Sequence, residues 1–412
     1  MWLLMVLSLA VALAWYHLYA PLPAGIREPR KLMLLDAVCK VVFHLAFLME
    51  RLGLGHHVIW IRQTSKHFEG TMKNLVKQGS GGVLRVSDVT FDGVPVRVYE
   101  PKACGEEGRP RRGLLYFHGG GWTFGSAKEG SYDENSRLMS NKLHVVLVSV
   151  EYRLYPEVRF PTQYLDCLAA AKHFLSPGVL AKYNVDPCRV GVSGDSAGGN
   201  LAAAVAQEVA MDDSMRVKFS VQALIYPVVQ ALDFNTPSYV QNQAMPILNR
   251  ALMVEFWLQY LGADPSLKSR FLSNHQQSTM TPELMACVDW TTLLPPKYKD
   301  GYKTVAVHGE GARGAAREEV PGLRDVRAAP LLARTEVLSR CPRAYVMTCE
   351  YDVLRDDGLM YARRLRDAGV AVTSDHYEDG FHGCLSLTLR PFQFDVGVRA
   401  LGRYIQWLSD NL

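Results

Sequence analysis

Cys188-Arg-Val-Gly-Val-Ser-Gly-Asp-Ser-Ala-Gly-Gly-Asn200 is the stretch that decides the fold of this 412-residue chain. Its centre, Gly194-Asp195-Ser196-Ala197-Gly198, stands between a β-branched apolar run and an alanine-rich run. A G-x-S-x-G pattern between a strand and a helix is typical of a sharp turn that exposes a nucleophilic serine. Gly194 and Gly198 leave room for the strand and the helix to pack closely around the turn. The stretch therefore predicts a nucleophile at Ser196, with Asp195 beside it, in an α/β sheet.

A second glycine-rich segment lies upstream, where Phe117-His118-Gly119-Gly120-Gly121-Trp122 follows the apolar run 114–117. Backbone amides without a neighbouring Cβ can donate to a developing oxyanion, and a His-Gly-Gly-Gly loop of this kind occurs beside nucleophilic serines. A phosphate-binding loop is the alternative, but the Gly-Lys-Ser/Thr that it requires is missing from the chain. The segment predicts an oxyanion-binding loop that His118 orients.

An acid and a base are expected downstream, in the order serine, acid, histidine. Asp352 follows the apolar run 343–351, and His382 follows the strand-like run 370–377. Loops at the carboxyl ends of successive strands meet at one edge of an open α/β sheet, so both side chains can reach Ser196. Three other acids compete for this role. Asp356 and Asp357 suit the first turn of a helix, and Asp379 suits a turn.

The rest of the chain predicts a mostly parallel sheet with helices on both faces. Two β-rich runs, 83–91 and 94–100, flank Asp92-Gly93, which is a strong hairpin pattern. Further strands are expected at 114–117, 145–150, 189–192, 221–226, 345–348 and 371–377. The insertion at about 234–335 has no clear strand over 234–300 and is expected to form a helical cap. The segment Gly309–Arg317 has the composition of a loop.

The amino-terminal part is apolar and helical in character. Residues 1–20 are long enough to span a bilayer, and a cleaved signal peptide is less favoured because no early Lys or Arg occurs and Leu18 stands near the candidate cut. Within residues 21–80, an amphipathic helix is expected at 31–54. Asp36 and Lys40 make a second span costly there. The catalytic domain would then cover 81–412. The apolar stripe of that helix would comprise Leu34, Val38, Val41, Val42, Leu45 and Leu52.

Charge and cysteine content exclude several classes of function. The net charge of +4 is small, and no nucleic-acid-binding motif is present. The eight cysteines are scattered without a disulfide framework or a zinc-type spacing, so we expect no metal and no organic cofactor. The chain carries no Asn-x-Ser/Thr sequon, so glycosylation cannot reveal on which side of a membrane the body lies.

Six motifs together resemble the hormone-sensitive-lipase group of α/β-hydrolases, and within it arylacetamide deacetylase and its paralogues. They are His118–Trp122, Tyr152-Arg-Leu-Tyr-Pro-Glu157, Gly194–Asn200, Asp325-Val-Arg-Ala-Ala-Pro-Leu-Leu332, Tyr351-Asp-Val-Leu-Arg-Asp-Asp-Gly358 and Glu378-Asp-Gly-Phe-His-Gly383. The resemblance implies an α/β-hydrolase fold and a serine hydrolase of lipophilic carboxylic esters or amides, without an obligate protein partner. By the same resemblance Ser196 is the nucleophile, His382 the base and Asp352 the acid. The oxyanion donors would be the N–H groups of Gly119, Gly120 and Ala197.

The resemblance also implies a single-pass, type II signal anchor with the body in the lumen of the endoplasmic reticulum. The basic residues Arg27, Arg30, Lys31 and Lys40 would instead favour a cytosolic body under the positive-inside rule, and we follow the resemblance. Lumenal relatives often pair a cysteine after the loop tryptophan with one at the position of Cys349. In this chain Thr123, and not a cysteine, follows the loop tryptophan Trp122. Cys349 is therefore a candidate buried free thiol. The helix at 31–54 is either a packed helix or, as the resemblance implies, part of a cap over the acyl pocket that touches the membrane. A catalytically silent ligand-binding module on the same fold is the alternative function.

Overall fold

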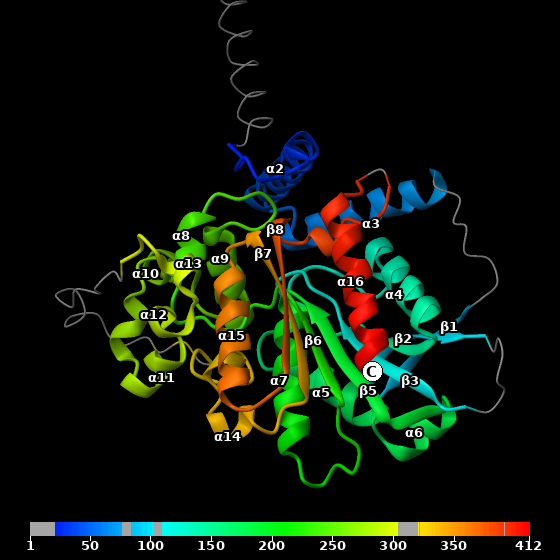
Figure 1. The fold of residues 1–412 in the computed structure, drawn as a ribbon. Coiled ribbons are helices and arrows are strands. Elements are labelled where there is room, and N and C mark those ends of the chain that lie inside the picture. Colours follow the sequence, from blue (N-terminus) through cyan, green and yellow to red (C-terminus); the bar gives the residue numbers. More distant parts are fainter. Residues whose placement is uncertain (1–20, 76–83, 103–108, 304–319, 321, 391) are drawn as a thin grey trace, which may run out of the picture.

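A computed structural model describes residues 21–412 except 76–83, 103–108, 304–319, 321 and 391. Its centre is an eight-stranded sheet in the order β1-β2-β4-β3-β5-β6-β7-β8 (Figure 1). Strands β1, β2 and β4 pair antiparallel, and all pairs from β4 to β8 are parallel. The bounds are β1 (Leu84–Phe91), β2 (Val94–Pro101), β3 (Arg111–Phe117), β4 (Val145–Val150), β5 (Val185–Asp195), β6 (Val221–Ile225), β7 (Arg343–Tyr351) and β8 (Val372–Phe381).

The predicted strands are all present, and the central ones are buried from end to end. Every residue of β4 and β6 is buried, as expected for parallel strands covered on both faces. The predicted hairpin is also confirmed, because Asp92 and Gly93 turn with φ of 46° and 82° between β1 and β2. Strands β5, β7 and β8 extend beyond the predicted runs and end next to the predicted site residues.

Helices cover both faces of the sheet, each over its own apolar cluster. The alanine-rich face of α7, including Leu201 and Val205, lies in one cluster, and Tyr404 and Leu408 of α16 lie in the other. These helices hold the carboxyl ends of the parallel strands in fixed relative positions. The helices around the sheet are α4 (Gly130–Leu143), α5 (Thr162–Phe174), α6 (Pro177–Lys182), α7 (Ala197–Met211), α14 (Thr335–Leu338), α15 (Arg355–Asp367) and α16 (Asp395–Asn411).

The described residues of the insertion between β6 and β7 form helices joined by loops, with no strand, as predicted. The insertion lies to one side of the sheet in Figure 1. It comprises α8 (Pro237–Gln241), α9 (Arg250–Leu261), α10 (Lys268–Leu272), α11 (Pro282–Cys287), α12 (Trp290–Leu293) and α13 (Pro296–Lys299). The predicted loop Gly309–Arg317 lies outside the described residues.

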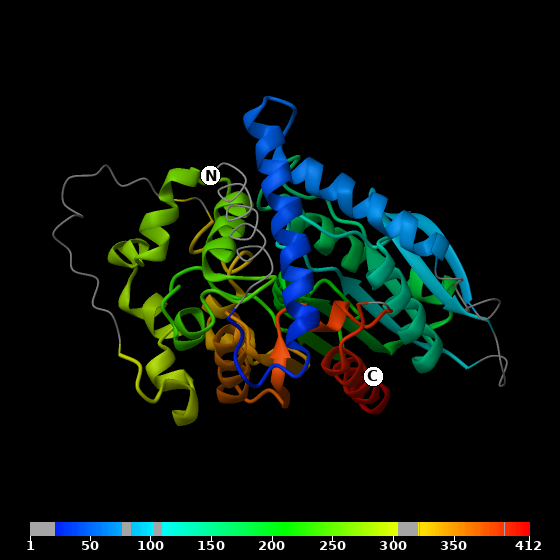
Figure 2. The same ribbon diagram turned by 90° about the horizontal axis from the view of Figure 1, so that it is seen from above.

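The amino-terminal helices α2 (Pro29–Arg51) and α3 (His57–Leu75) lie on top of the body. Figure 2 shows α2 lying across the molecule between the insertion helices and α3. The predicted helix at 31–54 is therefore present, although its predicted stripe is not packed against the body. Leu34, Leu45 and Leu52 are 54%, 53% and 62% exposed, and the buried side holds Leu32 and Ala46 instead.

By length and composition, α2 is the one described helix that could cross a membrane, a test that core helices and signal sequences also pass. The predicted anchor at residues 1–20 lies outside the described residues.

Candidate active site

Ser196 sits at the turn between β5 and α7, in a backbone conformation that residues other than glycine rarely adopt. Its φ of 54° and ψ of −119° lie outside the main allowed regions for an L-residue. A Cβ on Gly194 would overlap the backbone of Gly198, and a Cβ on Gly198 would overlap the carbonyl oxygen of Phe117. The glycines predicted to relieve crowding therefore do so, and the Ser196 N–H is fixed by donation to Ile225 O at 2.9 Å.

The structure brings Ser196, His382 and Asp352 together in one chain of hydrogen bonds. The Ser196 Oγ lies 3.0 Å from His382 Nε2, and His382 Nδ1 lies 2.8 Å from Asp352 Oδ2. Asp352 is fully buried, and its other carboxylate oxygen accepts from the Leu354 N–H at 2.8 Å. This geometry orients the imidazole so that Nε2 faces the hydroxyl.

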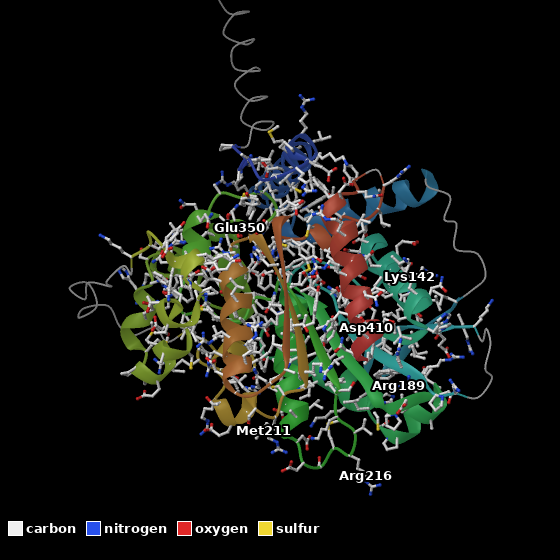
Figure 3. All side chains as sticks on the ribbon, in the orientation of Figure 1. Lys142, Arg189, Met211, Arg216, Glu350 and Asp410 are labelled. Carbon is white, nitrogen blue, oxygen red and sulfur yellow. The ribbon has the colours of Figure 1, made fainter. Side chains whose placement is uncertain are left out.

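These three side chains gather at the carboxyl edge of the sheet because each follows a parallel strand. Ser196 follows β5, Asp352 follows β7 and His382 follows β8. Figure 3 shows Glu350, near the end of β7, at the upper end of the sheet, opposite the end where Met211 and Arg216 lie.

The competing acids have other partners. Asp356 pairs with the buried Arg355, and Asp357 accepts from the Val229 N–H at 3.0 Å. Both lie in the first turn of α15, as the sequence predicts. Asp379 pairs with Arg27 and Arg399.

The glycine loop passes beside Ser196, but one predicted oxyanion donor points elsewhere. The Gly119 N–H donates to Asp195 Oδ1 at 2.9 Å. Gly120 and Gly121, with φ of 106° and 62°, line the cavity at Ser196 instead. The Gly119 amide, expected to donate to an oxyanion, is thus already satisfied by a buried carboxylate.

Asp195 is the centre of a buried polar cluster beneath this loop. Besides the Gly119 N–H, its carboxylate accepts from the hydroxyls of Tyr116 and Tyr132, both at 3.0 Å. Burial raises the pKa of Asp195 to about 6, and these hydrogen bonds oppose that rise. The cluster fixes the start of the loop relative to the turn at Ser196.

His118 and Trp122 hold the loop from its two ends. The His118 ring stacks on Tyr152 with 4.3 Å between centroids, and its Nδ1 lies 2.8 Å from Gly119 O. Burial lowers the pKa of His118. Trp122 is fully buried and stacks on Tyr260 of α9 at 4.1 Å. His118 therefore orients the loop, as predicted, and Trp122 ties it to the insertion.

Comparison with known proteins agrees with this architecture. A profile described as alpha/beta hydrolase fold matches residues 114–313 and 311–386. The chain belongs to this family. Neutral cholesterol ester hydrolase 1 of Bos taurus is 47% identical over 409 residues, which are 98% of each chain. Arylacetamide deacetylase of Oryctolagus cuniculus is 45% identical over 404 residues, 96% of each chain.

Solved structures give the same result. The carboxylesterase EstE1, cloned from a metagenomic library, is 28% identical, covers 86% of this chain and 97% of its own, and has a TM-score of 0.62. An esterase of Pyrobaculum calidifontis is 26% identical, covers 89% of this chain and 97% of its own, and has a TM-score of 0.63. The predicted resemblance is confirmed, and the chain is a hydrolase of this fold.

A cavity of about 830 Å³ opens in front of Ser196 in this hydrolase, and it is mainly apolar. Its walls come from three distant segments: the glycine loop, the insertion and the underside of α2. Phe124 lies edge-on to both Phe43 of α2 and Phe256 of α9, at 6.3 and 5.9 Å between centroids. The apolar side chains that line the cavity include Leu35, Phe43, Phe124, Met245, Ile247, Leu248, Leu252, Met253 and Phe256.

Sequence reasoning missed the two tyrosines that hold Asp195, and it did not identify which residues of α2 line the cavity. Tyr116 lies in a strand that reads as core, and Tyr132 lies in the first turn of α4 with no motif around it. No pattern in the sequence marks either as a partner of Asp195. For α2, periodicity marks an apolar face, yet Leu35 and Phe43 stand off the predicted stripe.

One group of possible metal ligands occurs among the described residues, away from this cavity's lining. Glu50, His56 and His57 place their ligand atoms within 4.8 Å of one another at the connection of α2 and α3. Their lone pairs are partly engaged, because His57 Nδ1 shares a 2.7 Å hydrogen bond with Glu50 and His56 Nδ1 accepts the Val58 N–H.

Proposed function

We propose that this chain is a membrane-anchored serine hydrolase that cleaves lipophilic carboxylic esters through Ser196, His382 and Asp352. The observation that carries the proposal is the chain of hydrogen bonds of 3.0 and 2.8 Å at the floor of an apolar cavity. A serine, its base and the group that orients the base occupy the relative positions that acyl transfer requires.

The mechanism follows from these positions. His382 accepts the Ser196 proton as Oγ attacks the acyl carbonyl, and Asp352 stabilises the imidazolium without taking its proton. Amides of Gly120, Gly121 and Ala197 then hold the oxyanion, each donor contributing about 3 kcal/mol to the transition state. Collapse of this intermediate expels the alcohol with the proton from His382, and water releases the acyl group by the same steps in reverse order.

The substrate class is inferred from the walls of the cavity and from the relatives. The side chains around Ser196 are largely apolar, and four charged side chains at the cavity form two ion pairs, Lys40 with Asp36 and Lys268 with Glu255. Burial of apolar groups favours binding of an uncharged, lipophilic ester. The names of the relatives, neutral cholesterol ester hydrolase and arylacetamide deacetylase, agree with a neutral lipid ester or an arylamide.

Membrane association is supported by the placement of α2. Its outer side presents Val38, Val41 and Leu48 to solvent, while Leu35 and Phe43 on the other side line the cavity. A helix that exposes so many apolar groups is typical of contact with lipid. With an anchor at residues 1–20, the body would lie against the bilayer of the endoplasmic reticulum, on its lumenal side, and take substrate from the lipid.

Labelling with a fluorophosphonate probe tests the proposal, because such probes react with a serine that its base activates. We expect the full-length protein to be labelled and to hydrolyse short-chain chromogenic esters, and Ser196→Ala to lose both while its fold is retained. Ser214→Ala, on an exposed loop, is the matched control and should behave like the wild type.

Two outcomes would contradict the proposal. Equal turnover by Ser196→Ala would remove Ser196 from the chemistry. A well-folded wild type that is neither labelled nor active, yet binds lipophilic esters, would favour the catalytically silent binding module.

A further inference from the structure

Two cysteine thiols meet in the core directly behind the proposed catalytic residues. The sulfur atoms of Cys349, in β7, and Cys384, just after β8, lie 3.8 Å apart, and both side chains are fully buried. Among the cysteines that the structure describes, no other pair has its sulfur atoms in contact. Cys349 is thus a buried thiol whose sulfur atom lies next to that of Cys384.

The surroundings of the two thiols allow the sulfur atoms to approach further. A disulfide brings its sulfur atoms to about 2.05 Å, so from their present 3.8 Å they have to close by about 1.8 Å. Gly380 leaves the space beside Cys349 open, since a Cβ there would lie 2.8 Å from the Cys349 sulfur.

The two cysteines lie close in the sequence to the proposed catalytic acid and base. Cys349 precedes Asp352 by three residues on the same strand end, and Cys384 follows His382 by two. A bond between them would close a loop that contains both Asp352 and His382. The separation of these two side chains, 2.8 Å in the hydrogen bond, would then be limited by a covalent link as well.

We propose that Cys349 and Cys384 are a disulfide-forming pair that joins the acid-bearing and base-bearing segments of this hydrolase. Each thiol gives up its hydrogen as the sulfur–sulfur bond forms. The two electrons and two protons pass to a low-molecular-weight disulfide of the glutathione type, which is cleaved into two thiols. The proposal concerns only the two sulfur atoms, so it stands whether or not Ser196 is catalytic.

Because both thiols are buried in the folded protein, thiol–disulfide exchange can reach them only during folding. Exchange requires a thiolate that reaches the oxidant, but both sulfur atoms are closed off from solvent and burial raises the pKa of the Cys349 thiol. The bond therefore forms as the chain folds, before the segment after β8 closes over β7. Once formed, it resists reductants that do not unfold the protein.

Peptide mapping tests the pairing directly. The reduced full-length chain is refolded in detergent in a mixture of reduced and oxidised glutathione, and the same chain is separately synthesised into microsomes. Free thiols are then blocked with N-ethylmaleimide under denaturing conditions, and the digested protein is analysed by mass spectrometry. We expect peptides joined through Cys349 and Cys384, with the buried Cys167 and Cys341 carrying the label. Folded protein from both preparations with Cys349 and Cys384 both labelled, or with Cys349 joined to another cysteine, would overturn the proposal.

Thermal unfolding gives a second readout that does not depend on activity. A reductant present during unfolding should lower the transition temperature of the oxidised wild type by a few degrees, because the reduced unfolded chain gains conformational freedom. Cys384→Ala should lose this response. Cys341→Ala, the matched buried control, should keep it. A wild type whose transition temperature is unchanged by reductant would contradict the bond.

Discussion

A single methyl group at residue 198 decides whether the turn at Ser196 can form. A Cβ on Gly198 would overlap the carbonyl oxygens of Phe117 and His118, and backbone atoms of a buried strand cannot move aside cheaply. We expect Gly198→Ala to lower the free energy of unfolding by about 1–3 kcal/mol and to abolish fluorophosphonate labelling. Urea denaturation and labelling measure the two effects.

The control for this substitution is Gly402→Ala in the interior of α16, where an added Cβ meets no atom within 4 Å. It should raise the free energy of unfolding by about 0.5–1 kcal/mol. If Gly198→Ala were as stable and as well labelled as Gly402→Ala, the steric argument for the turn would be wrong.

Asp195 links stability to pH. Its pKa is raised to about 6 from an ordinary value of 3.8, so the folded chain keeps the proton up to about pH 6 while the unfolded chain loses it above about pH 4. The contribution of this carboxyl to the free energy of unfolding is therefore complete below about pH 4, and it is lost as the pH rises from about 4 to 6. The loss amounts to as much as about 3 kcal/mol, and it remains constant above that range.

Asp195→Asn should remove that pH dependence, since asparagine keeps an oxygen for the Gly119 N–H but does not titrate. The measurement is the free energy of unfolding at several pH values for the wild type and the variant. The exposed Asp300 offers a control, Asp300→Asn, which should follow the wild type. Parallel curves for all three proteins would show that Asp195 does not carry the effect.

At the scale of the residue, the sequence predicts which residues lie at the site better than it predicts where their polar atoms point. The fold brings Ser196, Asp352 and His382 together as expected, because their order and their places after strands put them at one edge of the sheet. The hydrogen bond from the Gly119 amide to Asp195 could not be predicted, because it depends on Asp195, Tyr116 and Tyr132, which meet only in the folded chain.

At the scale of the element, α2 has two apolar sides with different tasks. We expect Val41→Asp combined with Leu45→Asp, on the exposed side, to weaken binding to lipid vesicles at least tenfold and to leave turnover of a soluble ester unchanged. Residues 1–20 should be removed from both proteins, so that an anchor there does not mask the effect. Flotation of the protein with vesicles measures the binding.

The matched variant on the other side of α2 is Phe43→Ala, which alters the cavity wall. It should raise KM for the soluble ester and leave vesicle binding intact, since its side chain faces the protein. If the double aspartate variant also raised KM, or if Phe43→Ala also lost vesicle binding, the two sides of α2 would not be separable.

The sequence predicts helices and strands well where it contains a clear turn motif or an apolar run that must be buried on both faces. The hairpin at Asp92-Gly93 and the strands β4 and β6 follow from turn chemistry and from continuous β-branched runs. The outcome for α2 differs because helical periodicity reveals that an apolar side exists, but not whether protein or lipid covers it. Leu34 and Leu45 satisfy the pattern equally in both cases.

At the scale of the whole molecule, Arg62 of α3 joins the amino-terminal helices to the body. Its guanidinium donates to the carbonyl oxygens of Thr123, at 2.8 Å, and Tyr155, and it pairs with Glu157. Loss of two charged hydrogen bonds to backbone should lower the local stability of α2 and α3 by about 2 kcal/mol. Arg62→Met is therefore expected to speed amide exchange over 29–66 about thirtyfold.

Exchange in β4 and β6 should stay as slow as in the wild type, because neither strand contacts Arg62 in this arrangement. Glu157→Gln is the control: Glu157 is 53% exposed, and exposed pairs contribute little, so exchange over 29–66 should hardly change. Uniformly faster exchange throughout the molecule in Arg62→Met would indicate general destabilisation instead of release of the two helices.

The overall arrangement was predictable in part. Alternation of strands and helices gave the layered sheet, and the strand-free stretch after 234 gave the helical insertion. Which side chains of α2, α9 and the glycine loop meet in the cavity could not be predicted, because Phe43, Phe124 and Phe256 are separated by long stretches of chain and share no motif.

The walls of the cavity and the residues at its floor belong to separate parts of the chain, and this division has a consequence for how such enzymes diversify. Substitutions in α2 or α9 can reshape the space around a substrate while the strand ends below stay as they are. Preference for one ester over another can therefore drift, one wall residue at a time, without passing through an inactive ancestor.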